Sequence, residues 1–252
     1  MPKIKDKNPM TNIDVFSKTP LIGILCWQEG SSPRGLVQLE ALPGNSTNPA
    51  TFKFPVKYSR VKGANIHTIL ENPCQKVLQS MIHEACKMEA QGIKAITTSC
   101  GFNAVFQREL ADAVSIPVFT SSLMQIPLVQ NMLTNQQTIG VITAKKSALT
   151  AQHMENAGVN KQVSIQIQGL EECLEWNKIF SSPDEEIDID IVENDVISRA
   201  SSMMKHSNIG AFVLECTDLP PFANAIRKAT DLPVFDFVTL TNFVYQGIKI
   251  TD

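Results

Sequence analysis

The sequence has 252 residues, which is enough for one large domain or for two modest ones with cores of their own. Hydrophobic residues make up 43% and charged residues 19%, as is usual for globular proteins, and the formal net charge is -3. This charge excludes a general electrostatic attraction to nucleic acid or acidic membranes, and no apolar run is long enough to span a bilayer. We therefore expect no nucleic-acid partner and no membrane partner.

Cysteines and histidines are both scattered along the chain. No two cysteines are close enough for a zinc ribbon or a CxxC motif, and the four histidines show no ligand spacing, so we expect no metal site. Because the N-terminal stretch does not have the pattern of a secretory signal, we expect free thiols in the reducing cytoplasm. The six cysteines are Cys26, Cys74, Cys86, Cys100, Cys173 and Cys216.

The first half of the chain predicts alternating strands and helices. Residues 1–19 are polar and Lys-rich, which predicts a flexible leader. Short apolar runs predict strands, and Asn72-Pro73 predicts a helix start with Asn at the N-cap. In chain order, the expected elements are the strand Leu21–Cys26, loops over 27–35 and 42–51, the strand Phe54–Val61, a helix from Asn72-Pro73 to Gly92, the strand that ends at Cys100, and a helix with Phe106, Leu110 and Ala113 on its buried face.

The second half repeats this plan. Ser182-Pro183 predicts a helix start, since the acidic residues that follow suit the positive end of a helix dipole. In chain order, we expect the strand Ile139–Thr143, a helix from Ser147 to Gly158, the strand Val163–Ile167, the helix from Ser182-Pro183, the strand that ends at Cys216, and a last helix over Phe237–Ile248. The last helix is expected to pack back on the first half. Strands that alternate with helices predict mainly parallel sheets.

An internal repeat relates the two halves. The segment Ile93–Asn103 aligns without a gap on the segment that begins at Ile209, at the separation of 116 positions that also divides Cys100 from Cys216. The alignment continues to Pro117-Val118-Phe119, which falls on Pro233-Val234-Phe235, and Ile22-Gly23-Ile24 matches Ile139-Gly140-Val141. The repeat predicts an α/β fold with two pseudo-symmetric α/β domains, each with a mainly parallel sheet flanked by helices. We expect the leader over 1–19, a first domain over 20–118 plus 236–252, and a second domain over 119–235.

Each repeat presents one cysteine at the carboxyl end of a strand, where sites in parallel sheets lie. The position before a helix should lower the thiol pKa of Cys100 and Cys216. Across the interdomain cleft, one thiolate is placed to remove a proton from a carbon acid while the opposite thiol returns one, which inverts the carbon. Backbone N–H groups after the cysteines are suited to hold a substrate carboxylate. These groups belong to Gly101, Phe102, Asn103, Thr217 and Asp218. Neither a Gly-rich phosphate loop nor a pyridoxal site is evident, so we expect a reaction without a cofactor.

Two motifs resemble the aspartate/glutamate racemase superfamily, which also includes hydantoin racemases, maleate isomerases and arylmalonate decarboxylases. They are Thr98-Ser99-Cys100-Gly101-Phe102-Asn103 and Glu215-Cys216-Thr217-Asp218-Leu219-Pro220, and the resemblance covers nearly the whole chain after the leader. The first motif departs from the aspartate racemase branch, which has Asn-Thr after its first cysteine. The resemblance implies that the two cysteines are the proton-transfer pair, that Trp27-Gln28 and Thr143-Ala144 border the crevice, and that the protein is a homodimer.

The expected function is therefore a racemase that inverts the α-carbon of a small amino acid or a related carboxylate. The alternatives are a maleate-type cis–trans isomerase, in which one cysteine attacks a double bond, a hydantoin racemase, and a two-lobed small-molecule-binding protein without activity.

Other residues near these motifs have two interpretations. Asn103 and Asp218 are either helix caps or substrate contacts, and Ser121 and Ser122 are turn or cap residues with substrate contact as the alternative. Cys26 is interpreted as structural because its counterpart in the repeat is Thr143. The residues expected at the surface are His83, His153, Lys57 and Arg60.

Overall fold

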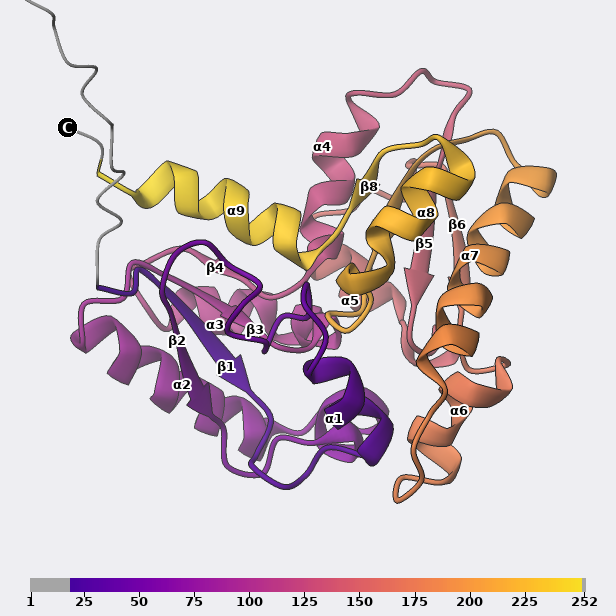
Figure 1. Ribbon diagram of the computed structural model, residues 1–252. Coiled ribbons are helices and arrows are strands. Elements are labelled where there is room, and N and C mark those ends of the chain that lie inside the picture. The colour runs from indigo at the N-terminus through magenta and orange to yellow at the C-terminus, as the bar shows by residue number, and fades with distance from the viewer. Residues whose placement is uncertain (1–18, 251–252) are drawn as a thin grey trace, which may run out of the picture.

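Two four-stranded parallel sheets form the core of the protein, which we describe from a computed structural model covering residues 19–250 (Figure 1). The strand orders are β2-β1-β3-β4 and β6-β5-β7-β8, so the two sheets share one topology and confirm the predicted fold class. The strands are β1 Ile22–Cys26, β2 Val56–Arg60, β3 Ala95–Thr98, β4 Val118–Phe119, β5 Thr138–Thr143, β6 Ile165–Gly169, β7 Ile209–Leu214 and β8 Val234–Phe235. The predicted leader lies outside the described residues except for Thr19.

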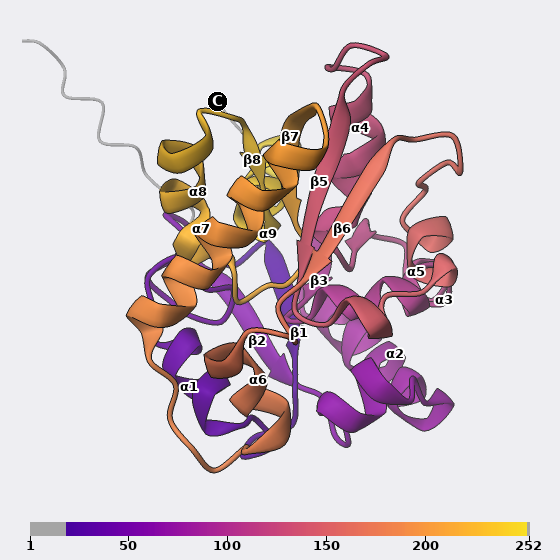
Figure 2. The same ribbon diagram turned by 90° about the vertical axis from the view of Figure 1, so that its right-hand side faces the viewer.

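Helices connect the strands and flank the sheets (Figures 1 and 2). They are α1 Arg34–Glu40, α2 Gln75–Ala90, α3 Gln107–Asp112, α4 Ile126–Gln130, α5 Ala151–Asn156, α6 Leu174–Ser181, α7 Ile189–His206, α8 Ala223–Thr230 and α9 Phe237–Ile248. Short 3₁₀ segments cover Gly101–Phe106, Ser122–Gln125, Lys146–Ala148 and Pro220–Phe222, and a π-helical turn covers His67–Glu71. Within residues 19–250, no helix is both long and apolar enough to cross a membrane.

The last helix returns to the first sheet, as predicted. Asp236 caps α9 by accepting a hydrogen bond from the backbone N–H of Thr239 at 2.8 Å. Phe237 belongs to the same buried cluster as Ile22 and Ile24 of β1. Tyr245 stacks on Phe54 with 3.6 Å between ring centroids. The last helix, which follows the second half in the chain, therefore belongs to the core of the first half.

Three predicted helix starts are wrong, because the helices begin at later residues. Asn72 ends the preceding π-helical turn by donating its backbone N–H to the His67 carbonyl, so α2 begins only at Gln75. Ser182 ends α6, and α7 begins at Ile189, where the Asp188 carboxylate accepts hydrogen bonds from two backbone N–H groups. Likewise, α5 begins at Ala151 rather than at Ser147. No bounds were predicted from the sequence for the short helices α1, α4 and α6.

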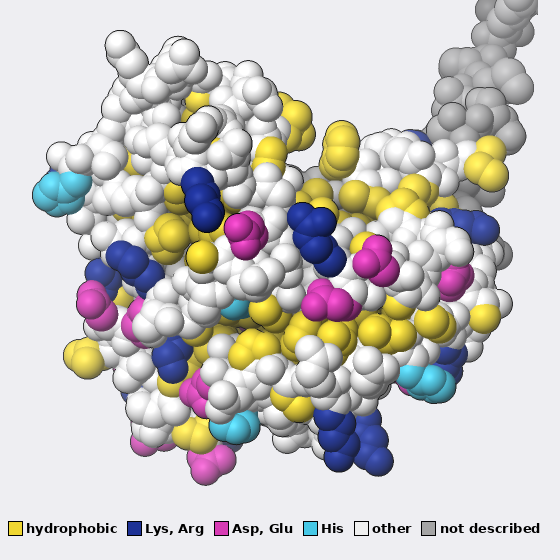
Figure 3. All heavy atoms as spheres, turned by 180° about the vertical axis from the view of Figure 1, so that it is seen from behind, with side chains coloured by type: hydrophobic (Ala, Val, Ile, Leu, Met, Phe, Trp, Pro, Cys, Tyr) yellow, Lys and Arg dark blue, Asp and Glu magenta, His cyan; other side chains and the backbone are white. Residues whose placement is uncertain are grey.

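The largest hydrophobic cluster includes residues of both halves, among them Leu25 and Ile96 near the first sheet and Trp176 and Leu214 in the second half. The two halves therefore share one packed core around the carboxyl ends of their strands. On the face seen from behind, basic and acidic side chains are interspersed, so this face has no large patch of one charge sign (Figure 3).

Candidate active site

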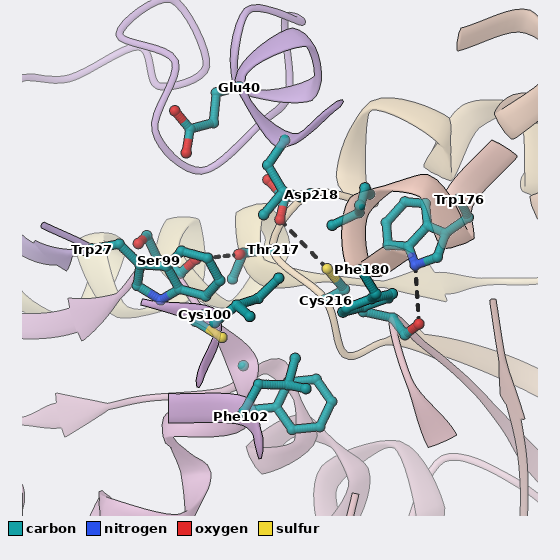
Figure 4. A pocket seen from close by; sticks show the side chains of 16 residues that line it. Trp27, Glu40, Ser99, Cys100, Phe102, Trp176, Phe180, Cys216, Thr217 and Asp218 are labelled. Atoms are coloured by element: carbon teal, nitrogen blue, oxygen red, sulfur yellow. Dashed lines mark hydrogen bonds between the residues drawn. The ribbon is translucent and has the colours of Figure 1, made fainter. Parts of the chain in front are cut away.

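Cys100 and Cys216 line the same cavity between the two halves (Figure 4). Each lies two residues beyond the end of a central strand, Cys100 after β3 and Cys216 after β7. Both are buried, with 8% of their surface exposed, and both are free thiols. The sequence-predicted residues that also line the cavity are Trp27, Gly101, Phe102, Ala144, Thr217 and Asp218.

Four further candidates are buried but do not line this cavity, and the hydroxyl groups of three of them bond to neighbouring segments. Thr143 donates its hydroxyl to a Glu215 carboxyl oxygen at 2.7 Å. Ser121 accepts the backbone N–H of Leu123, and Ser122 donates to the Leu214 carbonyl. Asn103 is 1% exposed. Substrate contact by these side chains therefore finds no support in the arrangement of the cavity wall.

The two cysteine loops, residues 99–102 and 215–218, contact each other where the two repeats meet. Thr217 donates its hydroxyl to the Ser99 carbonyl at 2.6 Å. At the equivalent place in the other loop stands Gly101, where a Cβ would lie 2.3 Å from both the carbonyl and a carboxyl oxygen of Glu215. Glycine is therefore required after Cys100, because the Glu215 residue occupies the space that any side chain would need. This packing explains why the first motif departs from the Asn-Thr pattern.

The expected lowering of the thiol pKa values is wrong. Burial raises the pKa of Cys100 well above its ordinary value, and the nearby Glu215 charge adds to this shift, while the Phe102 backbone N–H opposes it. Burial and then the Asp218 charge raise the pKa of Cys216 in the same way, against the Asp218 backbone N–H. The segments after the cysteines are short 3₁₀ turns, so their field is outweighed by desolvation and by the carboxyl groups.

Three carboxyl groups belong to the site: Asp218 and Glu40 line the cavity, and Glu215 directly precedes Cys216. Burial raises the pKa of Glu215 to about 8 and that of Asp218 to about 7. Asp218 accepts a hydrogen bond from Asn45 at 2.8 Å and one from the Cys216 thiol at 3.6 Å. Burial also raises the pKa of Glu40, which α1 places on the cavity wall. Sequence reasoning missed Glu40 and Glu215 as site residues. Glu215 had one available signal, its place next to Cys216.

Aromatic side chains form much of the remaining wall. Trp27 and Phe102 come from the first half, and Trp176 and Phe180 come from α6 (Figure 4). The Trp176 indole is held in place because its N–H donates to the Ala144 carbonyl at 3.0 Å. Phe102 is supported from behind by His153, edge-on at 5.6 Å.

The sequence predicted His153 at the surface, and this prediction is wrong. His153 is buried behind Phe102, because α5 packs against the segment that follows Cys100. Burial lowers the pKa of His153 to about 4. Cys26 is buried outside the cavity, and burial raises its pKa to about 12. Arg60 donates to the Trp27 carbonyl at 3.4 Å, while Lys57 bonds Gln91, and neither side chain lines the cavity.

The cavity is narrow, and contacts between the halves flank it. It leaves about 30 Å³ for the centres of water molecules, which is room for about two waters. On one side α1 packs against α6 and the loop after it (Figure 2). Gln38 exchanges two hydrogen bonds with the backbone of Ile187, at 3.2 and 2.7 Å, and the Arg34 backbone N–H donates to the Pro183 carbonyl at 2.7 Å. These contacts join the two halves at one side of the cavity.

Within residues 19–250, no group of three or more His, Cys, Asp or Glu side chains is placed to hold a metal ion. The arrangement offers two thiols, three carboxyl groups and aromatic walls. Chemically, it is suited to transfer protons to and from a small molecule held between the halves.

The fold and the site define a two-lobed α/β protein with a cysteine from each lobe in one cavity. Residues 60–241 match the Asp/Glu/Hydantoin racemase family, and the chain belongs to this family. Among solved structures, it is similar in fold to allantoin racemase from Pseudomonas fluorescens, with a TM-score of 0.58, 14% identity and 90% of each chain covered. It is also similar to Picrophilus torridus aspartate racemase, with a TM-score of 0.54, 13% identity, and 92% of this chain and 96% of that one covered.

Curated relatives with higher sequence identity than these structures are named dimethylsulfoniopropionate lyases. The chain is 28% identical over 224 residues to a dimethylsulfoniopropionate lyase of Durusdinium sp. clade D, which covers 84% of this chain and 74% of that protein. It is 30% identical over 215 residues to dimethylsulfoniopropionate lyase 3 of Emiliania huxleyi, covering 81% of this chain. It spans only 56% of the length of the latter protein.

Proposed function

We propose that this protein is a cofactor-independent enzyme in which a cysteine thiolate removes the proton next to the carboxylate of a small organic acid. The observation that carries this proposal is the position of Cys100 and Cys216, one from each half, on the wall of one cavity. A thiolate is the basic form of cysteine, and a proton transfer of this kind needs the base within reach of the acidic carbon. Backbone N–H groups of the two cysteine loops would stabilise the charge that develops on the substrate carboxylate.

The reaction best supported is elimination from dimethylsulfoniopropionate, the substrate named in the curated relatives. Removal of the proton next to the carboxylate leaves an electron pair that forms a carbon–carbon double bond. The bond from the neighbouring carbon to the sulfonium sulfur then breaks, and its electron pair leaves with dimethyl sulfide. The products are acrylate and dimethyl sulfide, and the proton remains on the cysteine. One thiol is sufficient as the base for this reaction.

Racemisation is the second candidate, and the presence of the second thiol favours it. Without a leaving group, the same deprotonated carbon takes a proton from the opposite face, for which the other cysteine is the acid. Cys216 already donates its thiol hydrogen to Asp218, so its proton is held within the cavity. In either case we propose Cys100 and Cys216 as the catalytic pair, with Gly101, Phe102, Thr217 and Asp218 beside the substrate. We also propose two domains, over 20–118 plus 236–252 and over 119–235, and a homodimer.

The test is to incubate the purified protein with dimethylsulfoniopropionate and to measure dimethyl sulfide by headspace gas chromatography and acrylate by NMR. A parallel set of L-amino acids, hydantoins and maleate in deuterated water reports α-proton exchange and isomerisation. Equal amounts of dimethyl sulfide and acrylate would support the lyase. Exchange with inversion and without elimination would support the racemase. Binding without either reaction would leave only the two-lobed binding protein and contradict the proposal.

A further inference from the structure

One end of the cavity is acidic and lacks a cation of its own. Glu40 and Asp218 both line it, and among the described residues that form the cavity wall there is no Lys, Arg or His. The two carboxyl groups lie on the same side of the cavity, above the cysteines in the view of Figure 4. Burial is the largest cause of the raised pKa of Asp218; the Asn45 hydrogen bond opposes the shift, and the Glu40 charge adds to it. Asp218 therefore lies in the repulsive field of Glu40.

Glu40 has little to hold it in this position. The Ser32 hydroxyl donates a long hydrogen bond to its carboxyl group, at 3.4 Å. Burial raises its pKa and the charge of Arg60 acts to lower it, but the Arg60 guanidinium bonds the Trp27 carbonyl and does not lie on the cavity wall. Asp218 is better supported, since Asn45 donates to it at 2.8 Å. A half-buried carboxyl group with so weak a partner usually destabilises the fold, so its place on the wall points to a ligand.

The neighbouring side chains suit a bulky cation with weak hydration. The Trp27 indole lies below Glu40 in Figure 4, and Trp176 and Phe180 lie across the cavity. The indole N–H of Trp27 is buried without a protein acceptor, so it is a donor for the carboxylate of a ligand and not for its cationic group. Aromatic faces attract methylated onium groups, whose charge is spread over several carbons, better than they attract a neutral group of the same shape. Two carboxylates beside such faces supply the opposite charge.

We propose that Glu40 and Asp218, together with Trp27, form the subsite for a methylated sulfonium or ammonium group. In this subsite, Glu40 is the residue that favours a positively charged ligand over a neutral ligand of the same shape. The carboxylate of the same ligand then lies toward the cysteine loops. This inference rests on the proposed function in taking the cavity as the substrate site, but ligand binding does not require turnover. Glu40 comes from α1, far in sequence from either cysteine motif, and it acts on substrate choice and not on the proton transfer.

Two ligands of one shape and different charge test the subsite. In 3-(trimethylammonio)propanoate the quaternary nitrogen carries a positive charge, and in 4,4-dimethylpentanoate a carbon takes its place. Isothermal titration calorimetry of the wild-type protein should show at least about tenfold tighter binding of the charged ligand, since a desolvated cation–aromatic contact or ion pair contributes more than about 1.4 kcal/mol. Equal affinity for the two ligands, or binding of neither, would overturn the proposal.

Variants of Glu40 test whether its charge causes the preference for the charged ligand. Glu40→Gln keeps the shape and removes the charge, so it should weaken binding of the charged ligand about tenfold and leave the neutral ligand nearly unchanged. Glu40→Asp, which keeps the charge, should retain most of the preference. Glu29→Gln is the matched control, because Glu29 is an exposed carboxylate outside the cavity wall and should change neither affinity. An equal loss for both ligands in Glu40→Gln would show that Glu40 only supports the wall.

The outcomes are separable from those of the proposed function. Charge-selective binding without elimination or exchange would support the subsite and count against the lyase and the racemase. Elimination with charge-independent binding would support the lyase and overturn the subsite.

Discussion

Substitution of Gly101 by alanine tests the packing that brings the two cysteine loops together. A Cβ at this position would lie 2.3 Å from the Glu215 carbonyl oxygen and 2.3 Å from a Glu215 carboxyl oxygen, whereas real Cβ contacts essentially never fall below 3.0 Å. The carboxyl group can swing away, but the carbonyl belongs to the backbone of the opposite loop. The two loops must therefore move apart by at least the difference between these distances.

Overpacking of this kind costs about 1–3 kcal/mol. For a chain of this size, each kcal/mol lowers Tm by about 2–4 °C, so Gly101→Ala should lower Tm by about 2–12 °C. Because Cys100 is the preceding residue, turnover should fall further than stability, since a displacement of about 1 Å at a reacting group can reduce the rate about 100-fold.

Differential scanning calorimetry and the dimethyl sulfide assay measure the two effects. Gly247→Ala is the control, since nothing lies within 4 Å of a Cβ at that position of α9. It should leave turnover unchanged and raise stability by about 0.5–1 kcal/mol, as alanine does in helices. If Gly101→Ala matched the wild type in both Tm and turnover, the close contact with Glu215 would not exist in the protein.

The remaining predictions concern charge and the contacts between the halves. The folded-state pKa of Glu215 is raised from 4.5 to about 8, mainly by burial, so its contribution to stability is complete below pH 4.5 and is lost as the pH rises through about 8. Tm of Glu215→Gln should therefore fall less than that of the wild type between pH 5 and about pH 8, and parallel curves in thermal denaturation would contradict this. Gln38→Ala removes both hydrogen bonds to Ile187. Hydrogen-exchange mass spectrometry should then show about tenfold faster exchange in the loop after α6. Unchanged exchange would mean that this contact does not hold the two halves together. His153, with its pKa lowered to about 4 by burial, should keep the NMR signals of a neutral ring from pH 8 down to pH 5, and a midpoint near pH 6.5 would show an exposed ring.

The fold was predictable because its signals are local and occur twice. The apolar runs that end near Cys100 and Cys216 form the central strands β3 and β7, and the ungapped repeat required both to occupy the same place in two similar sheets. The last helix, Phe237–Ile248, has the predicted bounds, since its apolar face is continuous. By contrast, α1 and α6 are short, and contacts between the halves fix them more than their own sequence does.

The site was only partly predictable, because its electrostatics depend on residues far apart in the chain. The local rule that a helix start lowers a thiol pKa fails at Cys100, where burial and the carboxyl group of Glu215 from the other half dominate. Glu40 reaches the cavity through a helix that no pattern indicated. His153 was expected at the surface because a single histidine in a polar stretch carries no signal of the aromatic ring that covers it.

The most direct test of the account compares Cys100→Ser and Cys216→Ser with the wild type in the dimethyl sulfide assay, with circular dichroism to show that both variants are folded. If a thiolate removes the proton, at least one variant should lose about 100- to 10,000-fold in turnover, the usual contribution of a general base. If the second thiol is also the proton donor of a racemase, both variants should lose α-proton inversion. Two folded variants that keep near-normal rates in both assays would contradict the assignment of the reaction to the cysteine pair.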